Sequence, residues 1–224
     1  MHKILLVDDM RSFLDLEATF LSRAECHLLT ASTGLEAIRV ARSERPDLVV
    51  LDLEMPEMNG IQACRILKSD AATAKTPVVV LTWMQLEDEA RRAGADRFLR
   101  KPIDEPTFLA EVKRFLPIVE RNEKRVAVDA PVTLRGGAET FEARLVNLSR
   151  TGFYVATEQR PPIGARLEVA FSLPGENEGL RVDGTALVVR YGEEPPGFGC
   201  RFRHVAPETR PVLDDWVERS GGGG

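Results

Sequence analysis

The hydrophobic pattern of this chain changes near Arg125, and no other sequence feature restricts the possible folds as strongly. Before that residue, short apolar runs at residues 3–7, 47–51 and 77–81 are separated by segments with helical spacing. Nearly continuous apolar runs of this length are typical of parallel strands that are covered on both faces. The first half of the chain is therefore predicted to be an α/β domain with a doubly wound, parallel five-stranded sheet.

After Arg125, apolar and polar residues alternate in six short stretches, which Gly, Pro, Asn and Glu separate. The stretches are "RVAVDAPVTL", "TFEARLVNLS", "GFYVAT", "RLEVAFSL", "RVDGTALVVRY" and "GFGCRFRHV". This spacing predicts a small antiparallel β-barrel or sandwich. The last segment, "PETRPVLDDWVERS", predicts a C-terminal helix with one apolar face, because its apolar residues lie at helical spacing: Val212, Leu213, Trp216 and Val217.

A chain of 224 residues is long for one domain, because single cores usually settle at roughly 100 to 200 residues. We expect five parts along the chain. They are an α/β domain at residues 1–116, a connector at 117–124 that contains Arg121, a β-barrel at 125–206, a C-terminal helix at 207–219 and a disordered tail at 220–224.

The charge of the chain makes nucleic acid a poor default partner. Net charge is −5 at pH 7, and residues 1–116 carry 16 basic against 19 acidic side chains, which leaves 14 against 16 for the rest. A DNA-binding domain normally has a cationic excess that displaces counterions from phosphates. We therefore expect no DNA partner, although a few arginines could still hold a small anionic ligand.

Neither a membrane segment nor a disulfide is expected. No apolar run approaches the roughly 18 residues that a membrane span needs, and the start, "MHKILLVDDM", turns acidic too soon for a signal peptide. Cys26, Cys64 and Cys200 are far apart and lack metal-ligand spacing. We interpret them as reduced core thiols and predict a cytoplasmic protein.

Functional groups gather at the carboxyl ends of the strands in a doubly wound sheet, and the residues found there indicate a phosphoryl site. Asp8 and Asp9 follow the first strand, Asp52 the third, Thr82 the fourth and Lys101 a fifth strand, "DRFLR". Three crowded carboxylates repel one another unless a cation such as Mg²⁺ neutralises them. Asp52 would then be available as a nucleophile toward a phosphoryl donor, while Thr82 and Lys101 hold the phosphoryl oxygens.

In this order, "LLVDDM", "VLDLEMPEMNG", "VVVLT" and "RKPID" resemble the CheY-like receiver domain of two-component response regulators, over residues 1–116. The resemblance implies that a histidine kinase phosphorylates Asp52. The other roles that it implies are Mg²⁺ binding by Asp8, Asp9 and Asp52, phosphate sensing by Thr82 and Lys101, and a switch aromatic at Phe98.

Trp83 departs from the receiver pattern, which usually has a small residue directly after the threonine. A bulky ring beside the site could restrict the approach of the phosphodonor or of hydrolytic water. We therefore hypothesise that phosphorylation, dephosphorylation or both are slow.

Two arginines four residues apart, Arg121 and Arg125 in "RNEKR", lie where the two hydrophobic patterns meet. A guanidinium offers a planar fork to phosphate oxygens or a guanine edge, and its flat face can stack on a base. Downstream, "NLSRTG" supplies Asn147, Ser149 and Gly152; the polar groups suit a purine edge, and the glycine lets the backbone come close. Together these residues indicate a nucleotide site rather than a metal site.

In the context of the predicted barrel, "RNEKR" and "NLSRTG" resemble the two signatures of the PilZ domain, R-x-x-x-R and [D/N]-x-S-x-x-G, over residues 117–206. PilZ domains are bacterial receptors for cyclic di-GMP. The resemblance implies a cyclic di-GMP site formed by Arg121, Arg125, Asn147, Ser149, Arg150 and Gly152. Many members have another basic residue where this chain has Glu120, so ligand stoichiometry and affinity stay open.

A simpler interpretation exists for each of these residues taken alone. Asp8 could be a helix N-cap, Asp52 a turn residue and Lys101 a solvated charge. The "RNEKR" segment could be a solvated connector, and "NLSRTG" a hairpin turn that needs Asn, Ser and Gly for backbone reasons. Fitting residues at successive strand ends make chance a poor explanation for the phosphoryl site.

The favoured function is a bacterial response regulator with two inputs, which acts on an unidentified downstream protein. Because the arginine pair lies at the connector, we expect ligand capture to be coupled to phosphorylation. The sequence is also compatible with a homodimer. The alternative is a receiver joined to a PilZ-like adaptor that binds a protein partner and no nucleotide. A DNA-binding regulator lacks a basic recognition helix, and we expect no enzyme because the barrel offers no acid/base pair.

Overall fold

The computed structural model describes residues 1–119, 123–173 and 180–220. The chain divides into two compact units, Met1–Arg121 and Asn122–Gly224, which we call the α/β domain and the β domain. Of the tail expected at residues 220–224, residues 221–224 lie outside the described ranges.

The α/β domain contains the five-stranded parallel sheet that the apolar runs predict. Its strands are β1 (His2–Val7), β2 (Cys26–Ala31), β3 (Leu48–Leu51), β4 (Val78–Thr82) and β5 (Arg97–Arg100), in the spatial order β2-β1-β3-β4-β5. Since β1 pairs with both β2 and β3, the direction of sheet growth reverses at the β1/β3 pair. In doubly wound sheets, ligand sites form outside the carboxyl ends of the strands at such a switch point.

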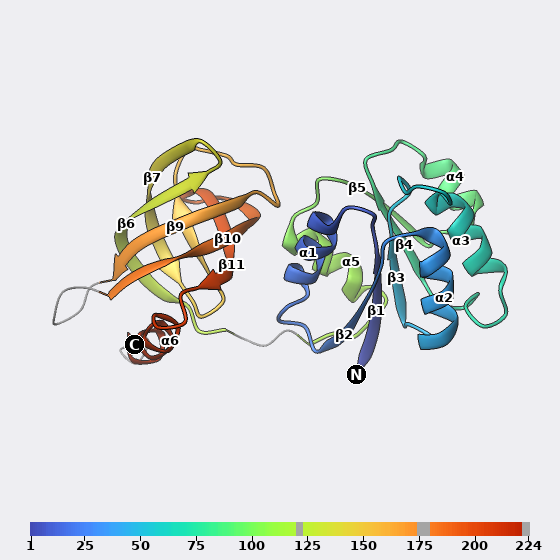
Figure 1. Ribbon diagram of the computed structural model, residues 1–224, viewed down its shortest axis with the longest axis horizontal. Coiled ribbons are helices and arrows are strands. Elements are labelled where there is room, and N and C mark those ends of the chain that lie inside the picture. The colour runs from blue at the N-terminus through green and yellow to red at the C-terminus, as the bar shows by residue number, and fades with distance from the viewer. Residues whose placement is uncertain (120–122, 174–179, 221–224) are drawn as a thin grey trace. The chain divides into compact units, whose positions relative to one another are not determined.

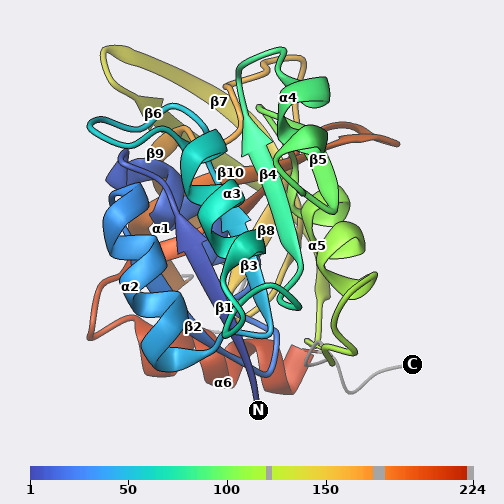
Figure 2. The same cartoon turned by 90° about the vertical axis from the view of Figure 1, so that its right-hand side faces the viewer.

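Helices cover both faces of this sheet (Figure 1). They are α1 (Arg11–Phe20), α2 (Gly34–Glu44), α3 (Gly60–Ser69), α4 (Glu87–Arg92) and α5 (Glu105–Lys113). α1 and α5 lie on one face, and Figure 2 looks onto the opposite face, which α2 and α3 cover. The side chains of Thr33, Asn59 and Asp104 cap α2, α3 and α5 by accepting backbone N–H groups of the first turn, so local sequence fixes where these helices begin.

Burial explains which strands are visible as apolar runs. Every residue of β3 and β4 is buried, as expected for central strands with helices on both faces. The edge strand β2 has only Ala31 buried, and its His27 and Thr30 are exposed. Its sequence, "CHLLTA", therefore shows no continuous apolar run.

The β domain is a closed antiparallel barrel of six strands. The strands are β6 (Val126–Gly136), β7 (Glu139–Leu148), β8 (Gly152–Ala156), β9 (Arg166–Leu173), β10 (Leu180–Glu193) and β11 (Pro196–Val205). Their order is β10-β11-β8-β7-β6-β9, and β9 pairs with β10 to close the ring. Of the two architectures that the alternation allows, the barrel is the one formed, and each of its described strands pairs with a neighbour on both sides.

Helix α6 (Arg210–Ser220) packs against the barrel core. Leu213 and Val217 are fully buried there, and the half-buried Trp216 packs against the same cluster. Val212 is instead 45% exposed. The helix extends to Ser220, the residue at which the sequence pattern placed the start of the tail.

The three cysteines are free thiols, with Cys64 and Cys200 buried and Cys26 half-buried. Burial raises the pKa of Cys64 to about 11, and it raises the pKa of Cys26 and of Cys200 as well. At neutral pH these thiols are therefore protonated and weakly nucleophilic. Within the described ranges, no helix is both long enough and apolar enough to cross a membrane.

Candidate functional site

Three carboxylates meet at the switch point of the α/β sheet. Val7 and Leu51, the last residues of β1 and β3, are register partners, and the N–H of Asp52 donates to the carbonyl of Val7 at 2.9 Å. The residues that follow these strands are therefore neighbours. Asp8, Asp9 and Asp52 each offer an oxygen atom, and these atoms all lie within 4.8 Å of one another.

Lys101 lies against two of these carboxylates. Its Nζ donates a hydrogen bond to Asp8 Oδ2 and lies 3.2 Å from Asp52 Oδ2. Its backbone N–H donates to the carbonyl of Thr82 at 2.9 Å, which fixes the residue after β5 beside the end of β4. Asp8, Asp52 and Lys101 are all buried, and the peptide bond between Lys101 and Pro102 is cis.

The electrostatics of this cluster suit a hard cation. Burial raises the pKa of Asp8, and the hydrogen bond from Lys101 opposes that rise. Burial alone would lower the pKa of Lys101, but its hydrogen bond with Asp8 and the charges of Asp52 and Asp8 raise it above the usual value, so the amine stays charged. One ammonium against three carboxylates leaves an excess of negative charge, and an all-oxygen donor set of this kind fits Mg²⁺.

Asp52 is held firmly at the end of β3. The N–H of Leu53 donates to Asp52 Oδ1 at 2.7 Å, while Oδ2 faces Lys101. Gly60, the first residue of α3, packs so closely on this segment that a Cβ there would lie 2.1 Å from the Asp52 carbonyl oxygen. Gly60 was not among the predicted site residues, and "NG" before an apolar helix was the available signal.

The other predicted receiver residues occupy the ends of β4 and β5. Thr82 is fully buried, and its hydroxyl accepts the N–H of Met84 at 3.4 Å. Phe98, on β5, is half-buried and packs against the core formed with α2, α3 and α4. Both residues therefore lie on the elements where the sequence placed them.

An aromatic pair that includes Trp83 borders the cluster. The ring of Phe13, on α1, lies 4.3 Å from the Lys101 amine, within reach of a cation–π interaction. Trp83 meets Phe13 edge-on, with 6.1 Å between ring centroids, and is itself 46% exposed. Sequence reasoning found Trp83 but not Phe13, because a single aromatic residue in an amphipathic helix carries no distinguishing signal.

Glu17 is a buried carboxyl group behind the cluster, and sequence reasoning missed it too. It lies on α1, and no described residue donates a hydrogen bond to its Oε2. Burial raises the pKa of Glu17 to about 8, although the charge of Lys101 lowers it in part. The only available signal was an acidic residue between Leu16 and Phe20, on the buried side of an amphipathic helix.

In the β domain, the two predicted nucleotide motifs contact each other. Arg125, directly before β6, donates from Nη1 to Asn147 Oδ1 at 2.8 Å. Asn147 lies on β7 and pairs with Ala127 of β6, so strand pairing keeps the two side chains adjacent. Arg121, the other member of the arginine pair, lies outside the described residues.

Ser149 and Gly152 hold the turn between β7 and β8. The Ser149 hydroxyl donates to the Gly152 carbonyl at 2.9 Å, and Ser149 is fully buried. A Cβ on Gly152 would lie 2.1 Å from the carbonyl oxygen of Cys200, so only glycine fits against β11. The serine and the glycine of this motif are therefore explained by the backbone conformation of the turn and its close approach to β11.

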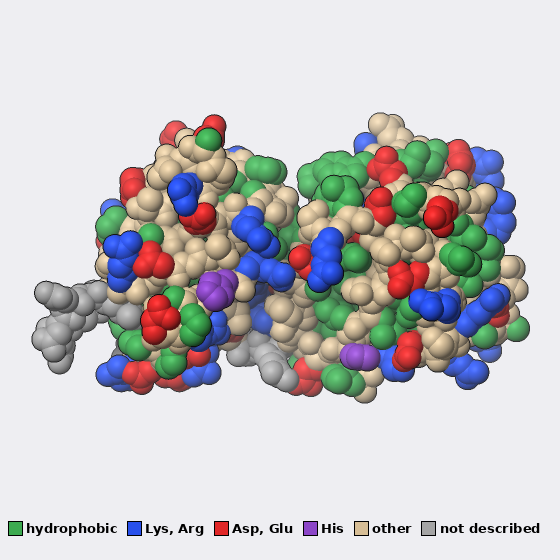
Figure 3. All heavy atoms as spheres, viewed as in Figure 1, with side chains coloured by type: hydrophobic (Ala, Val, Ile, Leu, Met, Phe, Trp, Pro, Cys, Tyr) green, Lys and Arg blue, Asp and Glu red, His purple; other side chains and the backbone are tan. Residues whose placement is uncertain are grey.

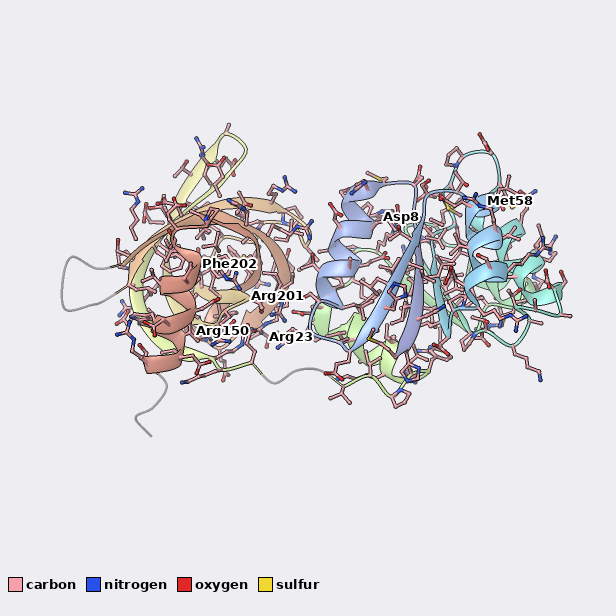
Figure 4. The ribbon with its side chains drawn as sticks, turned by 60° about the horizontal axis from the view of Figure 1, so that its bottom comes forward. Asp8, Arg23, Met58, Arg150, Arg201 and Phe202 are labelled. Carbon is pink, nitrogen blue, oxygen red and sulfur yellow. The ribbon has the colours of Figure 1, made fainter. Side chains whose placement is uncertain are left out.

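Arg150 is exposed in the same turn and pairs with helix α6. Its Nη2 lies 2.6 Å from Glu218 Oε1, and Lys124 Nζ lies 3.7 Å from Glu218 Oε2. Figure 4 labels Arg150 beside this helix. Glu218 thus supplies an anionic partner to two cations next to the motif, a contact that no local sequence pattern indicated.

Comparison with known families covers both domains. The family model for the response regulator receiver domain matches residues 4–113, and the PilZ domain model matches residues 120–219. The chain belongs to the response regulators, as a receiver domain fused to a PilZ domain. This confirms the family resemblance of both halves. Receiver and PilZ domains are typically signalling domains without enzymatic activity.

Several relatives match about half of this chain. Protein PilH of Pseudomonas aeruginosa is 36% identical over 119 residues, which are 52% of this chain and 98% of PilH. Protein PilG of the same organism is 30% identical over 118 residues, 51% of this chain and 87% of PilG. The solved structure of the chemotaxis response regulator CheY4 of Vibrio cholerae is 30% identical, covers 52% of this chain and 99% of its own, and has a TM-score of 0.49.

The match to the PilZ model includes both "RNEKR" and "NLSRTG", while the receiver match runs from β1 to α5. On the face drawn in Figure 3, acidic and basic side chains are interspersed over both domains. That distribution agrees with the weakly negative net charge of −5.

Proposed function

We propose that this response regulator is phosphorylated on Asp52, binds cyclic di-GMP through its PilZ domain and passes both signals to a partner protein in the cytoplasm. The observation that carries the proposal is the contact between Arg125 and Asn147, because it joins the two ligand motifs at one place. The receiver half supports the first input through its buried Asp52 and Lys101.

For phosphorylation, the phosphodonor is a histidine kinase. The bond between phosphorus and the donor imidazole nitrogen breaks, and a bond forms to a carboxylate oxygen of Asp52. Asp8, Asp9 and Asp52 would hold Mg²⁺, which neutralises phosphoryl charge during transfer. Lys101, already paired with Asp8 and Asp52, can turn its ammonium to the new phosphoryl oxygens, while the Thr82 hydroxyl is available at the end of β4.

For nucleotide binding, Arg121 and Arg125 grip the phosphates and contact guanine, and Asn147 presents its amide to the same ligand. Arg150 adds a further cation from the turn. Ser149 and Gly152 keep that turn in shape, as their contacts show. Planar guanidinium groups suit this ligand because they can bind phosphate oxygens and stack on a base.

Isothermal titration of cyclic di-GMP into the native protein and into Arg125→Ala tests this proposal, with GMP as the control ligand. Loss of one charge-assisted hydrogen bond of about 1.5 to 3 kcal/mol should weaken binding roughly tenfold to a hundredfold. Saturable native binding that collapses in the variant supports the proposal. Absence of native binding contradicts it.

The two inputs are proposed to be coupled, because the arginine pair lies between the domains along the chain at residues 121–125. Each ligand must then change the affinity for the other by the same factor. The test is the affinity for cyclic di-GMP with and without beryllofluoride and Mg²⁺, with Asp52→Asn as the control that cannot take the mimic. Identical affinities would exclude coupling.

A second candidate is an adaptor that binds protein and no nucleotide. The contact of Glu218 with Arg150 and Lys124 favours it, since these cations already have a partner in the free protein. Failure of native binding in the titration would favour this candidate.

A further inference from the structure

A carboxylate holds the middle of the "RNEKR" segment. Glu123 lies two residues after Arg121 and two before Arg125. Thr151, from the turn that contains the second motif, donates to both of its oxygens. The Thr151 N–H lies 2.7 Å from Oε1, and the Thr151 hydroxyl lies 2.6 Å from Oε2. The connector is therefore fastened to the turn at this residue.

Arg201 completes this contact. It lies on β11 with 2% of its side chain exposed, and its Nη1 lies 2.6 Å from Thr151 Oγ1 and 3.4 Å from Glu123 Oε2. The Thr151 hydroxyl thus donates to Glu123 and accepts from Arg201. Figure 4 labels Arg201 and Arg150 near each other in the β domain, which agrees with their contacts through adjacent residues.

The burial of these groups argues against an incidental surface contact. A guanidinium as deeply buried as that of Arg201 needs an anionic partner, and Glu123, only 10% exposed in its side chain, is one. A solvated connector would leave its glutamate in water. The Glu123–Thr151–Arg201 cluster instead draws the connector backbone onto the barrel.

The cluster also limits where Arg125 can be. Consecutive Cα atoms are about 3.8 Å apart, so the Cα atom of Arg125 lies within about 8 Å of the Glu123 Cα. Arg125 reaches Asn147 from this anchored segment. Fixing Glu123 therefore restricts the space in which the Arg125 guanidinium can meet a ligand.

We propose that Glu123, acting through Thr151 and Arg201, is a positioning residue for the cyclic di-GMP site. It holds the segment at Glu123 against the turn, so that Arg125, two residues further on, faces the ligand beside Asn147. This inference rests on the proposed function. Glu123 occupies a variable position of R-x-x-x-R, and the motif itself assigns it no role.

The test is a titration of cyclic di-GMP into the full-length native chain and three variants. Glu123→Gln keeps the size and one acceptor but removes the charge, and Thr151→Val removes the hydroxyl that joins the cluster. The matched control is Glu142→Gln, because Glu142 accepts a hydrogen bond from Thr133 at 2.7 Å in an exposed pair on the barrel. We expect each cluster variant to bind about tenfold more weakly or worse, and Glu142→Gln to bind like the native chain.

A second measurement separates positioning from stability alone. In ligand-free protein, hydrogen exchange at residues 123–126 and at Thr151 should accelerate in Glu123→Gln, while strand β9 keeps its protection. A role limited to stability would lower the unfolding temperature and leave the affinity of the folded protein unchanged. Titrations are therefore made well below the unfolding temperature of each variant.

The outcomes distinguish the two proposals. The positioning role is supported if the native chain binds cyclic di-GMP, both cluster variants bind it more weakly, and hydrogen exchange accelerates locally in Glu123→Gln. Native binding with unchanged affinity in both Glu123→Gln and Thr151→Val overturns that role and leaves the proposed function intact. No binding by the native chain overturns the proposed function, and the positioning role with it. Should Glu123→Gln fail to fold, Thr151→Val decides.

Discussion

Arg125 Nη1 lies 2.8 Å from Asn147 Oδ1, although the two residues are 22 positions apart in the chain. The contact spans the β6–β7 pair, in which Ala127 is the register partner of Asn147. Two motifs that are separate in the sequence thereby become one group of side chains. This relationship predicts that the two residues act on the ligand as a unit.

A double-mutant cycle on Arg125→Ala and Asn147→Ala tests that prediction. Each single change should weaken cyclic di-GMP binding about tenfold or more, because each removes or releases one polar group of the site. Since residues in contact usually couple, the double variant should lose less than the product of the two single losses. If calorimetry shows that the affinity loss of the double variant equals the product of the two single losses, the two residues act independently.

Trp83 should slow the phosphorylation cycle at Asp52. Its ring borders the cluster and packs on Phe13, which lies over the Lys101 amine. Trp83→Ala should therefore label faster from a small phosphodonor, lose the acyl phosphate faster, or both, by severalfold. Trp216→Phe, in the other domain, is the control. Equal labelling rates and equal acyl-phosphate lifetimes would contradict the idea.

The receiver domain should become less stable as pH rises, because of Glu17. Burial raises its pKa from 4.5 to about 8, so the folded state binds more protons than the unfolded state between those values. The free energy of unfolding then falls with rising pH across this window, by on the order of a few kcal/mol. Glu17→Gln, which cannot ionise, should lose this contribution to the pH dependence.

Urea unfolding at pH 5, 7 and 9 in EDTA checks the Glu17 prediction. A Trp216→Phe background makes Trp83 fluorescence report the receiver domain alone. Native and Glu17→Gln proteins should be close in stability at pH 5, with the variant increasingly more stable toward pH 9. A stability difference that stays constant with pH would mean that Glu17 does not titrate in this range.

Glu218 should compete with the nucleotide for cations of the PilZ domain. It pairs with Arg150 and Lys124, and all three side chains are partly exposed, so the contacts are worth about 0.2 to 1 kcal/mol. Glu218→Gln should raise the affinity for cyclic di-GMP up to about fivefold at low salt, and less at high salt. Asp215→Asn, which changes a carboxylate paired within α6, is the control. Equal affinities at low salt would contradict the prediction.

Much of the receiver site could be predicted because its residues are tied to strand ends. The apolar runs of β3 and β4 exist because both faces of these strands are buried, and a residue of the candidate site lies at the end of β4 (Thr82) and directly after β3 (Asp52). The edge strand β2 carries a weaker signal, since only Ala31 is buried. In the PilZ domain, alternation indicated the strands but not whether they form a barrel or a sandwich.

Local sequence is sufficient to specify the strand and helix periods, the caps of α2, α3 and α5, and which residues follow each strand, because these depend on near neighbours along the chain. Long-range packing instead sets the closure of the barrel through β9 and β10, the burial of Glu17 and the contact of Glu123 with Arg201, 78 residues away. These features arise when distant segments pack and exclude water. A buried charge and an exposed one look the same in a sequence, and only packing decides which partner each must find.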